Sequence, residues 1–197
     1  YPACHSLKEG KWLKGEYTGR TIEGKTWGVI GFGSIGRRVT DIAKALRAEV
    51  LAYDPYVPDE EFTKRGVKRI LRLEELLERS DIVSIHVNLS QETEGMISEE
   101  TLHKMKKGAY LINTSRGKII NQKALEKALE EGYLGGAALD VYEVEPPTDQ
   151  ELLCLPNLIC TPHIGGSTEE AFLNATEVLI RKLKEIFQIG EGAPLGY

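Results

Sequence analysis

A glycine-rich stretch at residues 26–36 constrains the fold of this chain more than any other feature. It reads Thr-Trp-Gly-Val-Ile-Gly-Phe-Gly-Ser-Ile-Gly, an apolar run that leads directly into three closely spaced glycines. An amphipathic run follows over 35–46, so the pattern predicts a strand, a tight turn and a helix. In such a unit Gly31 permits the turn, Gly33 lets the backbone approach a pyrophosphate, and Gly36 lets the helix pack closely on the strand.

The same stretch predicts a dinucleotide site. The start of the helix, at Ser34 and Ile35, presents unpaired N–H groups and the positive end of its dipole to phosphates. A second apolar run over 50–53 ends in Asp54, close to the offset at which an acidic residue binds the adenosine ribose. An Asp followed by Pro is also an ordinary turn opener. A carboxylate there would repel a 2′-phosphate, which favours NAD over NADP as the cofactor.

The composition narrows the class of protein. The chain has 197 residues, 41% of them hydrophobic, and a net charge of −5, which gives no reason to expect a nucleic acid or an anionic membrane as a partner. No apolar stretch approaches the roughly 18 residues of a membrane span, and no signal peptide is evident. The three cysteines are scattered and show no metal-ligand spacing, so we expect reduced thiols and no metal site. Reduced thiols in turn favour a cytoplasmic protein.

Apolar runs alternate with amphipathic ones along the chain, which predicts a doubly wound parallel α/β sheet of the Rossmann type. Residues 1–24 are interpreted as a polar helix remnant and a connector. The expected strands are 26–31, 50–53, 67–70, 82–85, 109–112, 136–139 and 158–160. The expected helices are about 34–48, 59–66, 73–80, 98–105, 121–132 and a long one to about 187, which a Ser167–Glu170 capping box would begin.

Ligands of such sheets bind beyond the carboxyl ends of the strands, so the polar residues at those ends are the candidate site. They are Asp54, His86, Arg116, Asp140 and His163, with Glu145 in the loop after Asp140. Arginine can hold a carboxylate through two parallel hydrogen bonds. Histidine can exchange a proton near neutral pH, and a carboxylate beside it would orient it. This set suits redox chemistry on a small acid.

Four segments carry a resemblance to a known family. They are Val29-Ile-Gly-Phe-Gly-Ser-Ile-Gly36, Leu111-Ile-Asn-Thr-Ser-Arg-Gly117, Gly136-Ala-Ala-Leu-Asp-Val-Tyr142 with Glu145-Pro146, and Thr161-Pro-His-Ile-Gly165. In this order the chain resembles the nucleotide-binding part of the D-isomer-specific 2-hydroxyacid dehydrogenases. The adjoining Gly166-Ser-Thr-Glu-Glu-Ala171 is similar to the D-3-phosphoglycerate dehydrogenases among them.

The resemblance implies a role for each matching residue. Arg116 would bind the substrate carboxylate and carbonyl, and His163 paired with Glu145 would be the acid/base. Lys14 would lie near a substrate phosphate. The residues expected to bind NAD are Gly31, Gly33, Ser34, Ile35, Gly36, Asp54, His86, Val87, Asn88, Thr114, Ser115, Asp140 and Gly165. The family also implies a homodimer formed through this domain.

Several of these residues have a plainer interpretation. Glu145 could be a surface loop acid, and its neighbour Glu143 is a rival for the pairing with histidine. His86 ends a strand, but the family uses backbone contacts there and no proton transfer. His5 and His103 are expected on helix surfaces, and Cys154 and Cys160 are interpreted as packing residues.

The chain also departs from the family. Asn88 replaces the proline of the family's His-x-Pro pattern. The family has two domains, so we expect residues 1–20 to be a connector helix from an absent substrate domain, 21–166 the NAD-binding domain, and 167–197 a helix returning to the substrate domain.

The resulting hypothesis is an NAD-dependent oxidoreductase of a D-2-hydroxy acid, with 3-phosphoglycerate as the leading candidate and a role in serine biosynthesis. A reductase of glyoxylate or hydroxypyruvate and an NAD-sensing corepressor-like binding protein are the alternatives. A formate-oxidising relative is disfavoured, because that branch carries glutamine where Glu145 stands.

Overall fold

The computed structural model of the chain describes residues 2–187. Residues 188–197, the end of the expected return segment, lie outside this range. The chain divides into two compact units, Tyr1–Pro162 and His163–Tyr197. The first unit contains the whole sheet, and the second contains one long helix.

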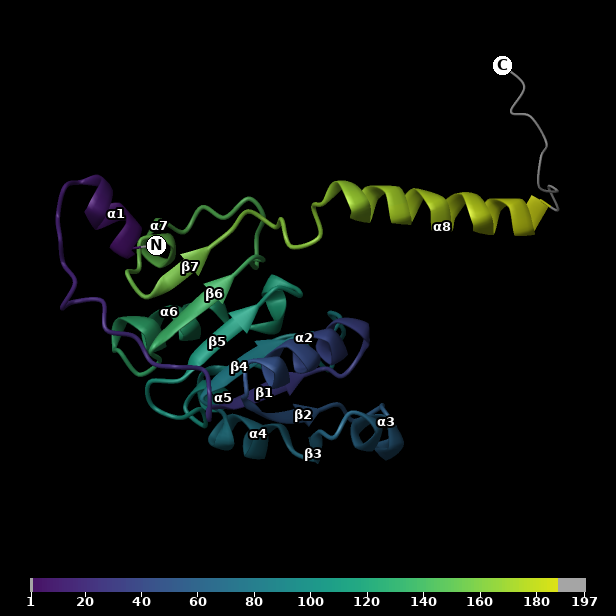
Figure 1. The fold of residues 1–197 in the computed structure, drawn as a ribbon, viewed down its shortest axis with the longest axis horizontal. Coiled ribbons are helices and arrows are strands. Elements are labelled where there is room, and N and C mark those ends of the chain that lie inside the picture. Colours follow the sequence, from purple (N-terminus) through teal and green to yellow (C-terminus); the bar gives the residue numbers. More distant parts are fainter. Residues whose placement is uncertain (1, 188–197) are drawn as a thin grey trace, which may run out of the picture. The chain divides into compact units, whose positions relative to one another are not determined.

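Seven parallel strands form the sheet of the first unit, in the order β3-β2-β1-β4-β5-β6-β7 (Figure 1). The strands are β1 (Thr26–Ile30), β2 (Glu49–Tyr53), β3 (Lys68–Ile70), β4 (Ile82–Ile85), β5 (Tyr110–Asn113), β6 (Gly136–Leu139) and β7 (Leu158–Cys160). Each of these was expected from the sequence to within one or two residues. The order reverses direction between β1 and β4, as it does in doubly wound sheets that bind dinucleotides.

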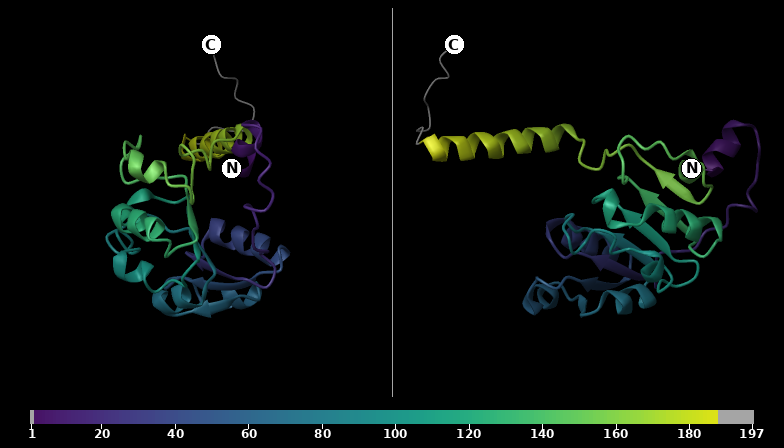
Figure 2. Two further views of the ribbon diagram at one scale, coloured as in Figure 1. Left: turned by 90° about the vertical axis from the view of Figure 1, so that its left-hand side faces the viewer. Right: turned by 180° about the vertical axis from the view of Figure 1, so that it is seen from behind.

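Helices cover both faces of the sheet, as two views at right angles show (Figures 1 and 2). The helices of the first unit are α1 (Pro2–Lys8), α2 (Ser34–Ala45), α3 (Asp59–Lys64), α4 (Leu73–Arg79), α5 (Glu99–Leu102), the short 3₁₀ helix η1 (Gly117–Ile119), α6 (Gln122–Glu130) and α7 (Gln150–Leu153), and the second unit contains α8 (Glu169–Phe187). The sequence did not predict α7, which Asp149 begins by accepting a hydrogen bond from the amide of Leu152 at 3.3 Å.

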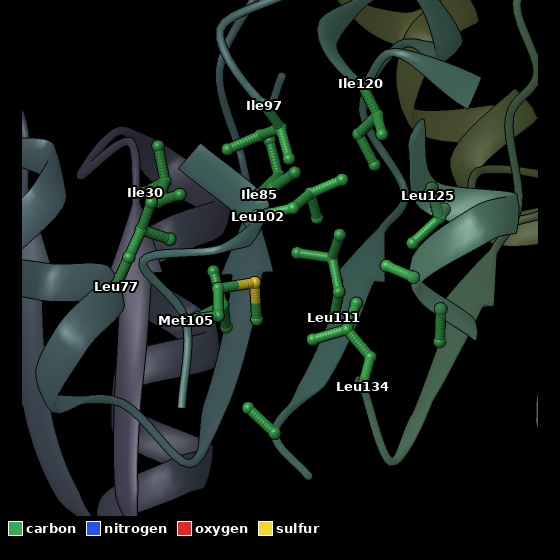
Figure 3. Close-up of a cluster of buried hydrophobic side chains, with 14 of the residues drawn as sticks. Ile30, Leu77, Ile85, Ile97, Leu102, Met105, Leu111, Ile120, Leu125 and Leu134 are labelled. Atoms are coloured by element: carbon green, nitrogen blue, oxygen red, sulfur yellow. The ribbon is translucent and has the colours of Figure 1, made fainter. Parts of the chain in front are cut away.

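Two hydrophobic cores, one on each face, explain the continuous apolar runs of the strands. Successive residues of a strand point to opposite faces, so Val29 joins one core and Ile30 the other. The larger core lies under α4, α5 and α6 and is drawn in Figure 3. The smaller one lies under α2 and α3, where the rings of Phe32 and Phe62 stack with centroids 4.4 Å apart.

Several helix ends differ from the prediction, among them those of α2, α5 and α8. Helix α2 ends at Ala45 because Arg47 adopts a left-handed φ of 60°, which lets the amide of Ala48 bond the carbonyl of Ala43 and close the helix. Helix α5 begins after Ser98 as predicted but stops at Leu102. The Ser167–Glu170 capping box is wrong: α8 begins one residue later, where the Thr168 hydroxyl accepts from the amide of Ala171 at 3.0 Å.

The second unit is dominated by α8, an amphipathic helix of 19 residues with no buried residue. Its apolar side chains include Phe172, Leu179, Leu183 and Ile186, which recur at helical spacing. Within residues 2–187 we find no helix with the length and apolarity that crossing a membrane requires.

Candidate cofactor and catalytic site

The carboxyl ends of the parallel strands lie along one edge of the sheet, which the arrowheads mark in Figure 1. The residues that come directly after β1, β2, β4, β5 and β6 are Gly31, Asp54, His86, Thr114 and Asp140. Because neighbouring strands are in register, the candidate residues of the first unit share this edge.

The three glycines of the turn have three different surroundings. Gly31 has a φ of 90°, and a side chain there would meet the carbonyl oxygen of His86 at 2.5 Å. A side chain on Gly36 would collide with the carbonyl oxygen of Gly31, so α2 can pack against β1 only through a glycine. Gly33 has no neighbour within 4 Å of where its side chain would lie. The space in front of Gly33, at the start of α2, is therefore open to a ligand.

Asp54 ties the end of β2 to the glycine turn. One oxygen of its carboxylate accepts a hydrogen bond from the amide of Phe32 at 2.8 Å. The other accepts from the amides of Tyr56 at 2.9 Å and Val57 at 3.3 Å. Asp54 therefore does open a turn, as its plainer interpretation suggested. It also lines a cavity beside the glycines.

That cavity has a volume of about 360 Å³, which falls within the range of small-molecule sites. Its walls come from the glycine turn, from residues 53–57 and from the segment between His86 and Met96. A hydrogen bond between the Tyr56 hydroxyl and the Glu92 carboxylate joins the last two walls and raises the pKa of Tyr56. The open glycine turn and the adjoining cavity fit the phosphates and adenosine of a dinucleotide.

His86 lines the cavity with a side chain that burial keeps neutral. Burial lowers the pKa of His86 to about 4. The indole N–H of Trp27 donates to the Ser84 hydroxyl at 2.9 Å, and Nε2 of His86 lies 3.0 Å from the same oxygen. A histidine that stays neutral at physiological pH is a poor proton carrier. That His86 does not transfer the proton stays a prediction, which its buried and neutral side chain favours.

A buried asparagine shapes the turn that presents Arg116. The side chain of Asn113 is fully buried; its oxygen accepts from the amide of Ser115 at 3.0 Å, and its nitrogen donates to the carbonyl of Arg116 at 2.9 Å. The Ser115 hydroxyl donates to the carbonyl of Ile85 at 2.6 Å and fastens the turn to β4. Arg116 itself is exposed at this edge, with its guanidinium donating to the Ser115 carbonyl at 2.6 Å.

The loop after β6 packs directly against the Arg116 turn. A side chain on Gly117 would collide with the backbone of Tyr142 and Glu143, so a glycine is required where the two segments touch. Glu145 closes this loop by accepting from the amide of Tyr142 at 3.1 Å. Glu143 instead accepts from the amide of Gln122 at 3.0 Å, at the start of α6. The rival acid therefore has a structural partner of its own.

Asp140 is buried at the end of β6 and accepts a hydrogen bond from the Thr161 hydroxyl at 2.6 Å. His163 begins the second unit and adopts a left-handed φ of 53°; Gly165 belongs to the same unit. Lys14 is exposed in a turn of the connector after α1. The convergence of Arg116, Glu145 and His163 stays a prediction.

The cysteines, His5 and His103 do not line the cavity beside the glycine turn, although Cys160 ends β7 at this same edge and packs against the larger core. Cys4, Cys154 and Cys160 are free thiols. The interpretation of Cys154 as a packing residue is wrong, because Cys154 is exposed at the C-terminal end of α7. His5 and His103 are exposed on or at the end of helices, as expected. Among the residues described, Glu126, Asp149 and Glu151 lie close enough to share a cation, and the ammonium of Lys123 already contacts the first two at 2.8 and 3.1 Å.

The sequence did not single out several residues that line the cavity. Tyr53, Tyr56, Val57, Glu92 and Met96 all belong to its walls. The first three flank Asp54 in the chain, so their position was available as a signal. Glu92 and Met96 lie several residues beyond β4, and only the folding of that loop brings them to the glycine turn.

A parallel sheet with this strand order, a glycine turn after its first strand and an aspartate after its second defines a dinucleotide-binding domain of the Rossmann type. A family model described as D-isomer specific 2-hydroxyacid dehydrogenase, NAD binding domain, matches residues 2–165. The chain belongs to this family, and its fold is that of the family's NAD-binding domain.

Similar proteins of known function and similar solved structures belong to the same family of dehydrogenases. The D-3-phosphoglycerate dehydrogenase of Bacillus subtilis is 43% identical over 96% of this chain and 35% of its own length. The hydroxypyruvate reductase of Thermotoga maritima is 42% identical over 92% of this chain and 59% of its own length. The D-lactate dehydrogenase of Aquifex aeolicus, solved with NAD and lactic acid, superposes with a TM-score of 0.85 at 33% identity, covering 95% of this chain and 61% of that one. The chain thus spans about one to two thirds of these relatives.

Proposed function

We propose that this chain is the NAD-binding half of an oxidoreductase that oxidises a D-2-hydroxy acid or reduces the corresponding 2-keto acid. The observation that carries the proposal is the contact of Gly117 with the 142–143 backbone, which sets the Arg116 turn against the loop of Glu145. The family match supports the same assignment.

In the proposed reaction, bound NAD would supply the acceptor for the hydride that leaves C2 of the hydroxy acid. Arg116 holds the substrate carboxylate and polarises the oxygen on C2, which fixes one orientation of the substrate. His163, paired with Glu145, takes the hydroxyl proton as the carbonyl forms. Asp140 would hold the carboxamide of the nicotinamide, and residues 31–36 with Asp54 would hold the phosphates and the ribose.

The proposed substrate is 3-phosphoglycerate, because the similar relatives include several D-3-phosphoglycerate dehydrogenases and the Gly166–Ala171 segment resembles theirs. Hydroxypyruvate and glyoxylate are the second candidates, because reductases of both are about equally similar at 42% identity. We further propose, by analogy with the family, a cytoplasmic homodimer formed through this domain, which sedimentation would test.

The decisive experiment measures nicotinamide absorbance with the full-length protein and a panel of 2-hydroxy and 2-keto acids. We expect Arg116→Gln, His163→Gln and Glu145→Gln each to lower kcat/KM about 10²- to 10⁴-fold while NAD affinity is retained. Glu143→Gln is the matched control, and its turnover is expected to stay near that of the wild type. Full turnover in His163→Gln, or an equal loss in Glu143→Gln, would contradict the assignment.

The 197-residue chain alone is expected to bind NAD but to turn over poorly, because the rest of the site that closes over the substrate lies outside it. Calorimetric titration with NAD and a parallel turnover assay test both halves of this statement. Rates like those of the full-length protein would refute the second half.

A further inference from the structure

A second cavity lies at the opposite edge of the sheet, where the strands begin. It has a volume of about 240 Å³ and is bounded by residues 20–22, Lys25, Asp81, Ile82 and residues 106–110. These are the segments that enter β1, β4 and β5. In Figure 1 the connector after α1 runs along this edge of the sheet. The cavity is therefore separate from the one beside the glycine turn.

Four cationic side chains line this cavity: Arg20, Lys25, Lys106 and Lys107. The lining contains one carboxylate, that of Asp81. Arg20 and Lys107 are exposed, and Lys25 and Lys106 are half-buried. The cavity floor includes Ile22 and Ala109, which offer apolar contact.

The single carboxylate of Asp81 balances one of these four positive charges. One of its oxygens accepts from the amide of Thr26 at 2.8 Å, and the other receives the ammonium of Lys106 at 3.1 Å. Burial alone would raise the pKa of Asp81, but these hydrogen bonds and the nearby Lys25 hold it below its usual range. The carboxylate of Glu23, which lies nearby in the chain, forms an ion pair with the guanidinium of Arg47 at 3.0 Å.

The lining of the cavity therefore keeps a net excess of three positive charges, four cations against one carboxylate. Within the part of the chain that the structure describes, the side chains of Arg20, Lys25 and Lys107 make no hydrogen bond or ion pair. Like charges that face one cavity repel each other and create a positive potential that an anion relieves. Arginine and lysine together are the usual ligands of phosphate and carboxylate groups.

We propose that this cavity binds a small multivalent anion carrying phosphate or carboxylate groups, at a site distinct from those of NAD and the substrate. Its volume lies below the usual range for a drug-sized ligand and suits a small metabolite better than a dinucleotide. The anion contacts Arg20, Lys25 and Lys107 and rests on the apolar floor.

Calorimetric titration of the chain with inorganic pyrophosphate and, separately, with citrate tests the site. Saturating NAD is present in both arms, so that the glycine turn cannot account for the binding. Pyrophosphate binding supports a phosphate ligand, citrate binding supports a carboxylate ligand, and binding of neither overturns the proposal. If the chain fails to bind NAD, the proposed function fails. The anion titrations of the variants at the cavity cations, given below, then still test the anion site.

The double variant Arg20→Gln/Lys107→Gln is expected to lose about tenfold or more in affinity for the anion, since two charge-assisted hydrogen bonds are removed. Lys182→Gln/Lys184→Gln on α8 is the matched control, because it removes the same charge from exposed positions of the second unit. We expect the control to bind the anion like the wild type, and NAD affinity to be unchanged in both variants. Equal anion affinity in the two double variants would overturn the proposal.

Discussion

At the scale of single residues, one residue type serves different purposes within a few positions. Position 31 requires glycine because its backbone is left-handed, and position 36 requires it because a side chain there would collide with the carbonyl oxygen of Gly31. Neither reason applies to Gly33. Gly33 has a φ of −75°, which any residue adopts, and open space in front of it. We infer that the glycine at position 33 serves a ligand that approaches the backbone rather than the packing of the chain.

This difference predicts opposite outcomes for two alanine substitutions. Gly36→Ala should destabilise the fold by about 1–3 kcal/mol, because its side chain overpacks the contact between α2 and β1. Gly33→Ala should leave the unfolding midpoint nearly unchanged but weaken NAD binding about tenfold. Chemical denaturation and NAD titration of both variants check this. Unchanged NAD affinity in Gly33→Ala would remove the argument for a bound pyrophosphate.

His86 predicts a pH dependence of stability. Its pKa is about 4 in the folded chain and about 6.5 in the unfolded chain, so the unfolded chain binds the extra proton between these values. Stability is therefore fully present above pH 6.5 and falls as the pH drops towards 4. The loss between pH 7 and pH 5 should be about 2 kcal/mol from this group.

Denaturation curves at pH 7 and pH 5 measure this loss. His86→Asn should remove most of it, whereas His103→Asn, at an exposed histidine, should retain the wild-type dependence. The same pH dependence in His86→Asn and in the wild type would show that burial of His86 is not its cause.

At the scale of elements, the site depends on the loops at the ends of the strands rather than on the strands themselves. The turn after β5 owes its shape to the side chain of Asn113, which replaces backbone partners that the strand no longer supplies. The loop after β6 owes its position to the absence of a side chain at Gly117. Together they bring the Arg116 turn and the Glu145 loop into contact.

Asn113→Ala tests the role of this turn. Removing the buried amide leaves the amide of Ser115 and the carbonyl of Arg116 without partners, which should cost about 1–3 kcal/mol. We expect the full-length variant to lose kcat/KM while NAD affinity is retained. Asn157→Ala is the control: its amide donates to the carbonyl of Leu129 at 3.0 Å, away from the turn. A similar loss of kcat/KM in Asn157→Ala would mean that lower stability alone explains the effect.

At the scale of the whole molecule, the two units differ in how they are stabilised. Both hydrophobic cores are built from residues that precede Pro162, and α8 contributes no buried residue. Among residues 2–187, all the buried apolar residues on which a cooperative fold depends therefore belong to the first unit. The second unit presents an amphipathic helix whose apolar side chains are exposed.

A chain that ends at Pro162 should accordingly unfold in one cooperative transition with nearly the midpoint of the longer chain. Denaturant unfolding followed by tryptophan fluorescence provides the measurement, because Trp27 lies in β1. A broad transition, or a large fall in the midpoint, would show that residues 163–197 stabilise the sheet.

Much of this molecule was predictable from the order of its residues. Continuous apolar runs predicted the parallel strands, and the glycine spacing predicted the turn, because both patterns reflect local geometry and burial on two faces. The sequence by itself also determined the polar residues at the strand ends and the family. It missed the start of α8, since both Ser167 and Thr168 can cap a helix and only the folded backbone shows that Thr168 does so.

Only the tertiary structure decided how distant segments meet. It placed Glu92 and Met96 beside the glycine turn, gave Glu143 a partner at the start of α6, and gathered four cations around Asp81 at the opposite edge. The physical reason is that such contacts depend on how loops pack over a folded sheet. The local periodicity of the sequence, which predicts helices and strands, carries no information about that packing.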